Sequence, residues 1–401
     1  MGMSRKEQAN NSLCHNLGPL RTRLDLGCTW RTRIAGGIRE ALGVRSHGTD
    51  CVRGARNTAV GWWLLGCAGM TLGAVVLGGV TRLTESGLSI VEWRPITGLL
   101  PPLSTEAWQE EFRKYKYFPE FQVMNKNMTL PEFQWIWYME YAHRVWGRAV
   151  GLAYILPAVY FWARGRLSGP LGPRVVGLCG LVCFQGVLGW YMVRSGLNVP
   201  ESSPDVPRVS HLRLAAHLGS ALLLYSGSLA QGLALLLPPL NLTHSAALLK
   251  LKYFAKGTTA LVFLTALSGA LVAGLDAGLV YNSFPLMGEG LMPSDIAALS
   301  PPLRNLIDNP STTQFQHRLL GVTTVGVTSA LFLWSRRLPL PPRPRAAITC
   351  LALMAWAQAS LGVATLLLYV PTALAASHQS GSVALLSFAI WLLTELRHVP
   401  K

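Results

Sequence analysis

The sequence predicts an all-α membrane protein with eight transmembrane helices. Half of its 401 residues are hydrophobic, only 13% are charged, and the mean hydropathy is +0.33. A soluble globular chain has about 25% charged residues, so these values disfavour a soluble enzyme. The net charge of +16 lies in short runs between long apolar stretches. This layout is typical of a polytopic membrane protein in a lipid bilayer and not of a nucleic-acid-binding protein.

The first 60 residues differ from the rest of the chain. They contain ten Lys/Arg, four acidic residues and no apolar run that resembles a secretory signal. An Arg-rich, acid-poor segment is typical of a mitochondrial transit peptide, and the alternative is a disordered basic tail. We expect residues 1–60 to be a targeting segment.

Eight apolar segments follow, each near the ~20 residues that a helix needs to cross a bilayer. The last two are separated at Pro371, which starts a new helix more readily than it continues an old one. The segments run approximately over 62–81, 143–163, 174–193, 212–236, 257–275, 317–334, 346–369 and 373–394.

The connections alternate in charge. The loops at 164–174, 237–256 and 335–345, together with the tail, hold twelve Lys/Arg against one acid, whereas the other connections are longer and richer in acids. Basic residues in short loops mark the inner side of a membrane, so both termini are expected inside. The long, acidic and aromatic connection 82–142 is expected to fold into a cap on the outer side.

An internal repeat divides the chain into two halves. Residues 141–145 match 315–319, 184–189 match 357–362, 214–220 match 375–382 and, less closely, 84–88 match 275–279. The matches keep one order, which predicts two four-helix bundles that run parallel about an axis along the membrane normal. The predicted parts are a bundle at 61–236, a linker at 237–256, a bundle at 257–396 and a tail at 397–401.

Four histidines lie in apolar segments and are matched by the repeat: His143, His217, His317 and His378. Each begins a segment that enters from the outer side, so all four are expected at a similar depth. An ionisable residue in a membrane helix usually faces the bundle interior and has a function. Two histidines on facing helices can ligate a haem iron from both sides. Unrelated core histidines and a zinc site are the alternatives.

Arginines lie close to these histidines in the sequence. Arg144 and Arg318 directly follow a histidine, Arg148 lies four residues after Arg144, and Arg213 lies four residues before a histidine. Arginine binds carboxylates through two parallel hydrogen bonds, so these side chains can pair with haem propionates. Contacts with lipid headgroups are the alternative.

One acidic residue distinguishes the two halves. Glu140 lies three residues before His143 on the same helical face, whereas its counterpart in the second half is Gln314. A carboxylate beside a metal centre can move protons or stabilise charge, and the alternative is a solvated interfacial acid. We predict that Glu140 is functional and that the first half is the reactive one.

Several of these motifs together resemble the mitochondrial haem A synthase family, from about Gly61 to Lys401. The motifs are GGVTRLTESGLS (78–89), EYAHR (140–144), RLAAH (213–217), AGLDAG (273–278), QHR (316–318) and HQSG (378–381).

The resemblance implies an oxidoreductase that converts the C8 methyl group of haem O to a formyl group, giving haem A for cytochrome c oxidase in a reaction that depends on oxygen and water. It implies haem b between His317 and His378, the substrate haem O between His143 and His217, and Glu140 as the family's functional glutamate. It also implies the mitochondrial inner membrane, with both termini in the matrix.

The partners that follow from the resemblance are a ferredoxin-type electron donor, haem O synthase, cytochrome c oxidase assembly factors and a second copy of the chain. Two other functions fit the histidine pattern. One is a bis-haem electron-transfer cytochrome, and the other is a haem carrier that binds haem without changing it. Only an enzyme would need oxygen and a reductant to alter the bound porphyrin.

Overall fold

The computed structural model describes residues 47–94, 98–198, 206–240, 242 and 245–399, with side chains from Thr58 onward. The chain divides into two units, Met1–Ala55 and Arg56–Lys401, and every feature described below belongs to the second, apart from the first residues of helix α2 (His47–Leu83). Most of the predicted targeting segment therefore lies outside the described residues.

The described residues contain helices and no strand, and eight of these helices are long and apolar enough to cross a membrane. The predicted fold class is confirmed. The eight helices are α2 (His47–Leu83), α5 (Leu130–Ala163), α6 (Leu171–Leu197), α7 (His211–Leu236), α8 (Ala246–Gly274), α9 (Pro310–Ser335), α10 (Pro342–Leu367) and α11 (Thr372–Glu395). The last helix begins directly after Pro371, as the sequence predicts.

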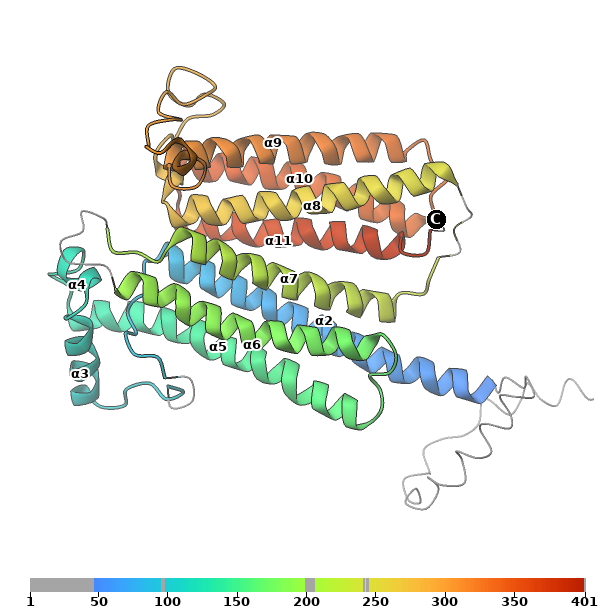
Figure 1. Ribbon diagram of the computed structural model, residues 1–401, viewed down its shortest axis with the longest axis horizontal. Helices are drawn as coiled ribbons and strands as arrows, with labels where there is room; N and C mark the ends of the chain where they lie inside the picture. The colour runs from blue at the N-terminus through green and yellow to red at the C-terminus, as the bar shows by residue number, and fades with distance from the viewer. Residues whose placement is uncertain (1–46, 95–97, 199–205, 241, 243–244, 400–401) are drawn as a thin grey trace, which may run out of the picture. The chain divides into compact units, whose positions relative to one another are not determined.

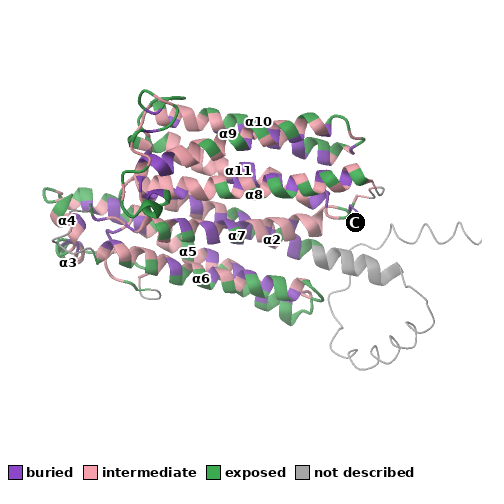
Figure 2. Cartoon of the chain, turned by 45° about the horizontal axis from the view of Figure 1, so that its top comes forward, coloured by how far each residue is buried: buried purple, intermediate pink, exposed green. Residues whose placement is uncertain are grey.

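The helices form two neighbouring groups. Figure 1 shows α2, α5, α6 and α7 side by side, with α8, α9, α10 and α11 beside them, and α7 contacts both α8 and α11. This arrangement is compatible with the two predicted bundles. Figure 2 shows exposed residues along the outward faces of the helices, and many of them are large and apolar. Such faces are stable against lipid tails, so the chain is a multi-pass membrane protein.

The backbone supports the least close of the four sequence matches, which relates residues 84–88 to residues 275–279. Glu85 and Asp276 both adopt the left-handed conformation, with φ of 51° and 50°. Each lies two residues beyond the end of a helix, α2 for Glu85 and α8 for Asp276. Because few residues other than glycine adopt this conformation, the coincidence supports equivalent turns in the two halves.

The connection between α2 and α5 folds into a cap, as predicted. Helices α3 (Thr105–Tyr115) and α4 (Pro119–Val123) lie over the start of α5 in Figure 1, and α3 contacts α5. An aromatic cluster fills the contact, formed by Trp108, Phe112, Tyr115, Phe133, Ile136 and Trp137.

Helix α5 begins earlier than the sequence predicted, at Leu130 and not at residue 143. Thr129 and Glu132 form a capping box, and Pro131 lies in the first turn, where its missing N–H costs nothing. The cap packs on one face of the first turns of α5, through Phe133, Ile136 and Trp137. Glu140 and His143 therefore lie well inside the helix and not at its start.

The start of α10 and the end of α11 are tied together by a buried ion pair. Arg343 donates to both oxygens of Glu395, at 3.0 and 2.6 Å, and the Glu395 side chain is fully buried. Trp391 Nε1 donates a further hydrogen bond to Glu395. Arg397, directly beyond α11, donates to the carbonyl of Leu237, which joins the tail to the linker.

The cap holds a second buried carboxyl group. Glu120 is 7% exposed and accepts a hydrogen bond of 2.9 Å from the Tyr115 hydroxyl group. Burial raises the pKa of Glu120 from its ordinary value near 4.5 to about 8. The folded cap therefore favours the protonated, neutral form of this side chain.

We expect the cap to lose stability as pH rises from about 4.5 through 8, because the folded pKa of Glu120 lies above its unfolded value. Glu120→Gln mimics the neutral acid and should remove this pH dependence. The check is thermal unfolding of the protein in lipid nanodiscs near pH 5 and near pH 9. Glu110→Gln, at an exposed position on α3, is the control, and an unchanged pH dependence in Glu120→Gln would contradict the assignment.

Candidate functional site

The four matched histidines form two pairs. His317 on α9 and His378 on α11 have ring centroids 6.3 Å apart and ring planes 87° apart. A bond of about 2 Å from a metal to an imidazole nitrogen puts two opposite rings with centroids about 6 Å apart, so this spacing fits one iron between the two rings. His143 on α5 and His217 on α7 lie within electrostatic range of each other.

Each imidazole ring packs against a glycine of a neighbouring helix, and the four rings are partly buried. A Cβ atom on Gly78, Gly189, Gly269 or Gly362 would lie between 2.7 and 3.3 Å from a histidine Cε1 atom. No larger residue fits there without a shift. These four glycines contact His143, His217, His317 and His378, in that order. Sequence reasoning missed these glycines, although their spacing follows the repeat.

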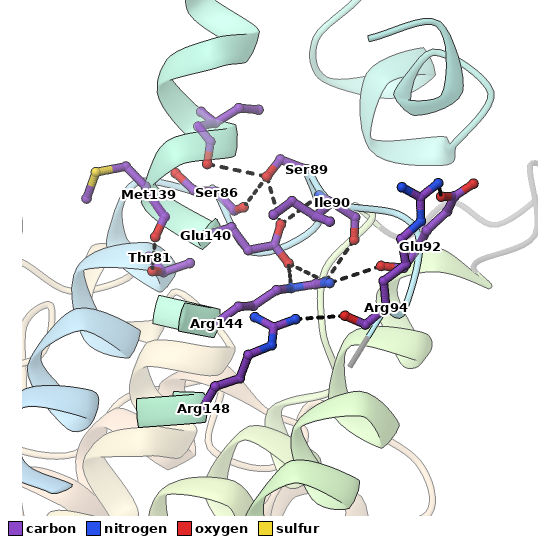
Figure 3. Close-up of polar contacts among 11 residues, drawn as sticks. Thr81, Ser86, Ser89, Ile90, Glu92, Arg94, Met139, Glu140, Arg144 and Arg148 are labelled. Carbon is purple, nitrogen blue, oxygen red and sulfur yellow. Dashed lines mark hydrogen bonds and ion pairs between the residues drawn. The ribbon is translucent and has the colours of Figure 1, made fainter. Parts of the chain in front are cut away.

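Glu140 is buried, with 3% exposure, and all its hydrogen-bond partners are donors. Figure 3 shows its carboxylate between the loop after α2 and Arg144. Oε2 accepts from Ser89 Oγ at 2.7 Å and from the Ile90 amide at 2.8 Å, and Oε1 accepts from Arg144 at 2.6 and 3.0 Å. A carboxylate, which only accepts hydrogen bonds, suits this position.

The matched position in the second half differs in its hydrogen bonds to the neighbouring loop. The Gln314 amide donates to the carbonyls of Ala277 at 2.7 Å and Tyr281 at 3.2 Å. Arg318 donates to Gln314 Oε1 at 3.0 Å and to the same Tyr281 carbonyl at 2.8 Å. The loop presents acceptors here, so an amide fits where a carboxylate does not. The Glu/Gln difference in the sequence therefore accompanies a difference in loop geometry.

The predicted arginines donate to protein carbonyl groups in this structure. Arg144 binds the carbonyls of Ile90 at 2.8 Å and Glu92 at 3.1 Å, and Arg148 binds that of Arg94 at 2.8 Å (Figure 3). Arg318 holds the loop after α8 in the same way. These three side chains tie the loops after α2 and α8 to α5 and α9.

Arg213 differs from the other three arginines. Its guanidinium lies 3.7 Å from the centre of the Tyr191 ring and donates to the Tyr191 carbonyl at 2.8 Å. It therefore joins α7 to α6. A cation over an aromatic ring is favourable and holds the side chain in a fixed direction.

An ion-pair cluster that the sequence did not reveal joins the two halves. Asp276, in the left-handed turn after α8, binds Arg82 at 2.6 Å and Arg208 at 2.7 Å. His211 and Asp308 form a second contact between the halves, with 3.1 Å between nitrogen and oxygen. These partners are far apart in sequence, so no local pattern connects them.

No cluster of three or more His, Cys, Asp or Glu able to hold a metal ion occurs among the described residues. The histidines stand in pairs, which argues against the zinc alternative. Paired imidazoles between membrane helices, one pair with a spacing that fits iron, are typical of a polytopic membrane protein that binds haem.

The chain belongs to the family of cytochrome oxidase assembly proteins, since the model of that family (COX15-CtaA) matches residues 61–390. It is 61% identical over 347 residues to "Heme A synthase COX15" of Bos taurus, covering 86% of this chain and 84% of that protein. It is 60% identical over 347 residues to the Homo sapiens protein of the same name, covering 86% and 85%. A "Heme A synthase-mitochondrial ferredoxin fusion protein" of Schizosaccharomyces pombe is 44% identical over 367 residues, covering 84% of this chain and 60% of that protein.

The contact between glycine and histidine gives a prediction for haem binding. Gly362→Ala puts a Cβ atom 2.7 Å from His378 Cε1 and should displace the ring, at a cost of about 1–3 kcal/mol. We expect less haem per protein in the purified variant, measured from its pyridine haemochrome spectrum. Gly326→Ala, in the interior of α9 with open space beside it, is the matched control. Equal haem content in the two variants would contradict this role of Gly362.

Proposed function

We propose that this chain is a haem A synthase that oxidises the C8 methyl group of haem O to the formyl group of haem A. The family match and the relatives at 60–61% identity support this activity. The observation that carries the proposal is the pairing of the imidazoles, because the 6.3 Å spacing of one pair fits a single iron. The mitochondrial inner membrane, with both termini in the matrix, follows from the mitochondrial relatives and from the distribution of basic loops.

The two halves have different roles in this proposal. The bundle at 61–236 binds the substrate haem O between His143 and His217, and the bundle at 257–396 holds haem b between His317 and His378. Haem b, when bound, supplies one-electron transfer. Arg144, Arg148, Arg213 and Arg318 lie near these pairs in the sequence, and their charge favours haem propionates at the outer ends of the helices.

Glu140 and Ser89 can hold a proton together. A proton on Glu140 Oε2 reverses the contact with Ser89, whose hydroxyl group then accepts from the acid. Ser89 Oγ lies 3.0 Å from the Ser86 carbonyl and 3.3 Å from the Ile136 carbonyl, so its own hydrogen keeps an acceptor. The pair therefore gains or loses a proton without leaving a buried donor unpaired, which is what proton transfer beside His143 requires.

The electron donor in this proposal is a ferredoxin-type protein. The Schizosaccharomyces pombe relative is by its name a fusion with mitochondrial ferredoxin, which supports this donor. The basic loops on the predicted inner side offer a complementary surface for an acidic partner. Haem O synthase and cytochrome c oxidase assembly factors are the proposed source of the substrate and acceptors of the product, and a homo-oligomer is the proposed assembly.

Extraction of the porphyrins from purified protein tests the function. We expect haem b together with haem O, its hydroxylated derivative or haem A, identified by reversed-phase chromatography with mass detection. Oxygen and a reductant should then convert bound haem O into the oxidised products. Haem b alone, with no conversion of added haem O, would favour the electron-transfer cytochrome. Bound haem O that is never converted would favour the haem carrier.

Glu140→Gln should keep both haems bound and lower the output of haem A. The substituted amide brings a donor group against Arg144 or the Ile90 amide, at a cost of about 1–3 kcal/mol, or on the order of 5–150-fold in rate. The measurement is haem A formed per bound haem O. Glu110→Gln, on the exposed face of the cap, is the control, and an output equal to that of the control would remove Glu140 from the mechanism.

A further inference from the structure

The imidazole of His317 is hydrogen-bonded through Nδ1 to Ser268. Ser268 Oγ lies 2.7 Å from His317 Nδ1 and 2.8 Å from the Thr265 carbonyl, which can accept the one hydrogen of the hydroxyl group. When the hydroxyl group donates to Thr265, it accepts from the imidazole. In that arrangement His317 carries its proton on Nδ1 and leaves the Nε2 lone pair free. This is the tautomer that binds a metal through Nε2.

The second imidazole of this half is also held at Nδ1. The amide nitrogen of Gln358 on α10 lies 3.0 Å from His378 Nδ1 and donates to the backbone carbonyl of the same residue. Both rings of the pair thus have polar partners from neighbouring helices, α8 for one and α10 for the other. The Gln358 amide nitrogen is a donor, so its contact orients the His378 ring but does not favour a proton on Nδ1.

The first half lacks these contacts. His143 Nδ1 and His217 Nδ1 are buried and have no hydrogen-bond partner among the residues that the structure describes. The separation in sequence between Gly78 and Gly269 equals that between Glu85 and Asp276 in the matched turns. That separation puts Leu77 at the position of Ser268, and leucine offers no acceptor.

A second difference between the halves concerns the glutamine beside the second histidine of each pair. Gln185, the counterpart of Gln358, donates to Ser220 Oγ at 2.7 Å and to the His217 carbonyl at 3.3 Å. The residue matched to Ser220 is Gly381, which has no side chain to compete for the amide. The hydroxyl group of Ser220 therefore holds the amide away from the His217 ring.

We propose that Ser268 is a positioning residue that presets His317 for permanent haem binding, and that Leu77 at the matched position leaves the first pair able to release its haem. The inference rests on the proposed function, in which one haem is a resident cofactor and the other a substrate. A hydrogen bond to the second ring nitrogen orients the ring and makes it a better ligand. Loss of such a partner typically costs about 10–100-fold in metal affinity.

The test is haem loss from purified protein, which requires no turnover. Wild type, Ser268→Ala and Leu77→Ser are mixed with excess apomyoglobin, and the haem that remains is identified by extraction. We expect Ser268→Ala to lose haem b about 10–100-fold faster than wild type. Leu77→Ser should retain the first-half haem longer. Ser335→Ala is the control, because Ser335 lies on α9 and its hydroxyl group bonds only its own helix.

A second readout separates positioning from general destabilisation. The ferric low-spin electron paramagnetic resonance signal depends on the angle between the two ligand planes, which is 87° here. Ser268→Ala should shift this signal, and Ser268→Thr, which keeps the hydroxyl group, should restore it. Unchanged haem loss and an unchanged signal in Ser268→Ala would overturn the proposal.

Different experimental results would refute the proposed function and this inference. Wild type that holds haem b but converts no haem O would end the synthase assignment, whereas the comparison of haem loss would still decide the role of Ser268. Wild type that binds no haem at all would overturn both.

Discussion

The packing of an imidazole ring against a helical glycine is the contact on which both sites depend. A histidine between apolar helices needs room for a flat ring, and only a residue without a side chain leaves that room while the helices stay close. The contact occurs in both halves, from Gly78 beside His143 to Gly362 beside His378. It limits where the rings can lie, and the loops after α2 and α8 are tied to α5 and α9 by Arg144 and Arg318.

The two halves share a backbone but differ in hydrogen-bond chemistry. Glu140 faces donors alone, whereas the Gln314 amide group also faces two carbonyl acceptors, although the turns at Glu85 and Asp276 have nearly the same φ. A repeated scaffold sets the positions of the side chains, whereas a few polar residues decide what each position can do. In the proposed function, one half can therefore hold a proton on Glu140, while the other orients His317 through Ser268.

The fold class and the four histidines were predictable because hydropathy and repeat matches are local properties of the sequence. The start of α5 was not, because a cap packs on its first turns, and the cap is held by aromatic contacts between distant residues. The contacts of Ser268 and Asp276 were missed for a similar reason, since each joins helices or halves far apart in the chain. The sequence shows that Arg144 is charged, but it does not show which loop carbonyls Arg144 binds.

In the proposed function, the cofactor and the substrate are both haems, so the enzyme must hold one and release the other. A difference of about tenfold in affinity corresponds to roughly 1.4 kcal/mol. The net contribution of a hydrogen bond is about 0.5–1.5 kcal/mol, so one contact at an imidazole nitrogen is of the right size. The second half has such a contact between Ser268 and His317, whereas His143 Nδ1 and His217 Nδ1 have no partner among the described residues. In this proposal one side-chain difference, Leu77 for Ser268, gives two similar bundles different affinities for haem.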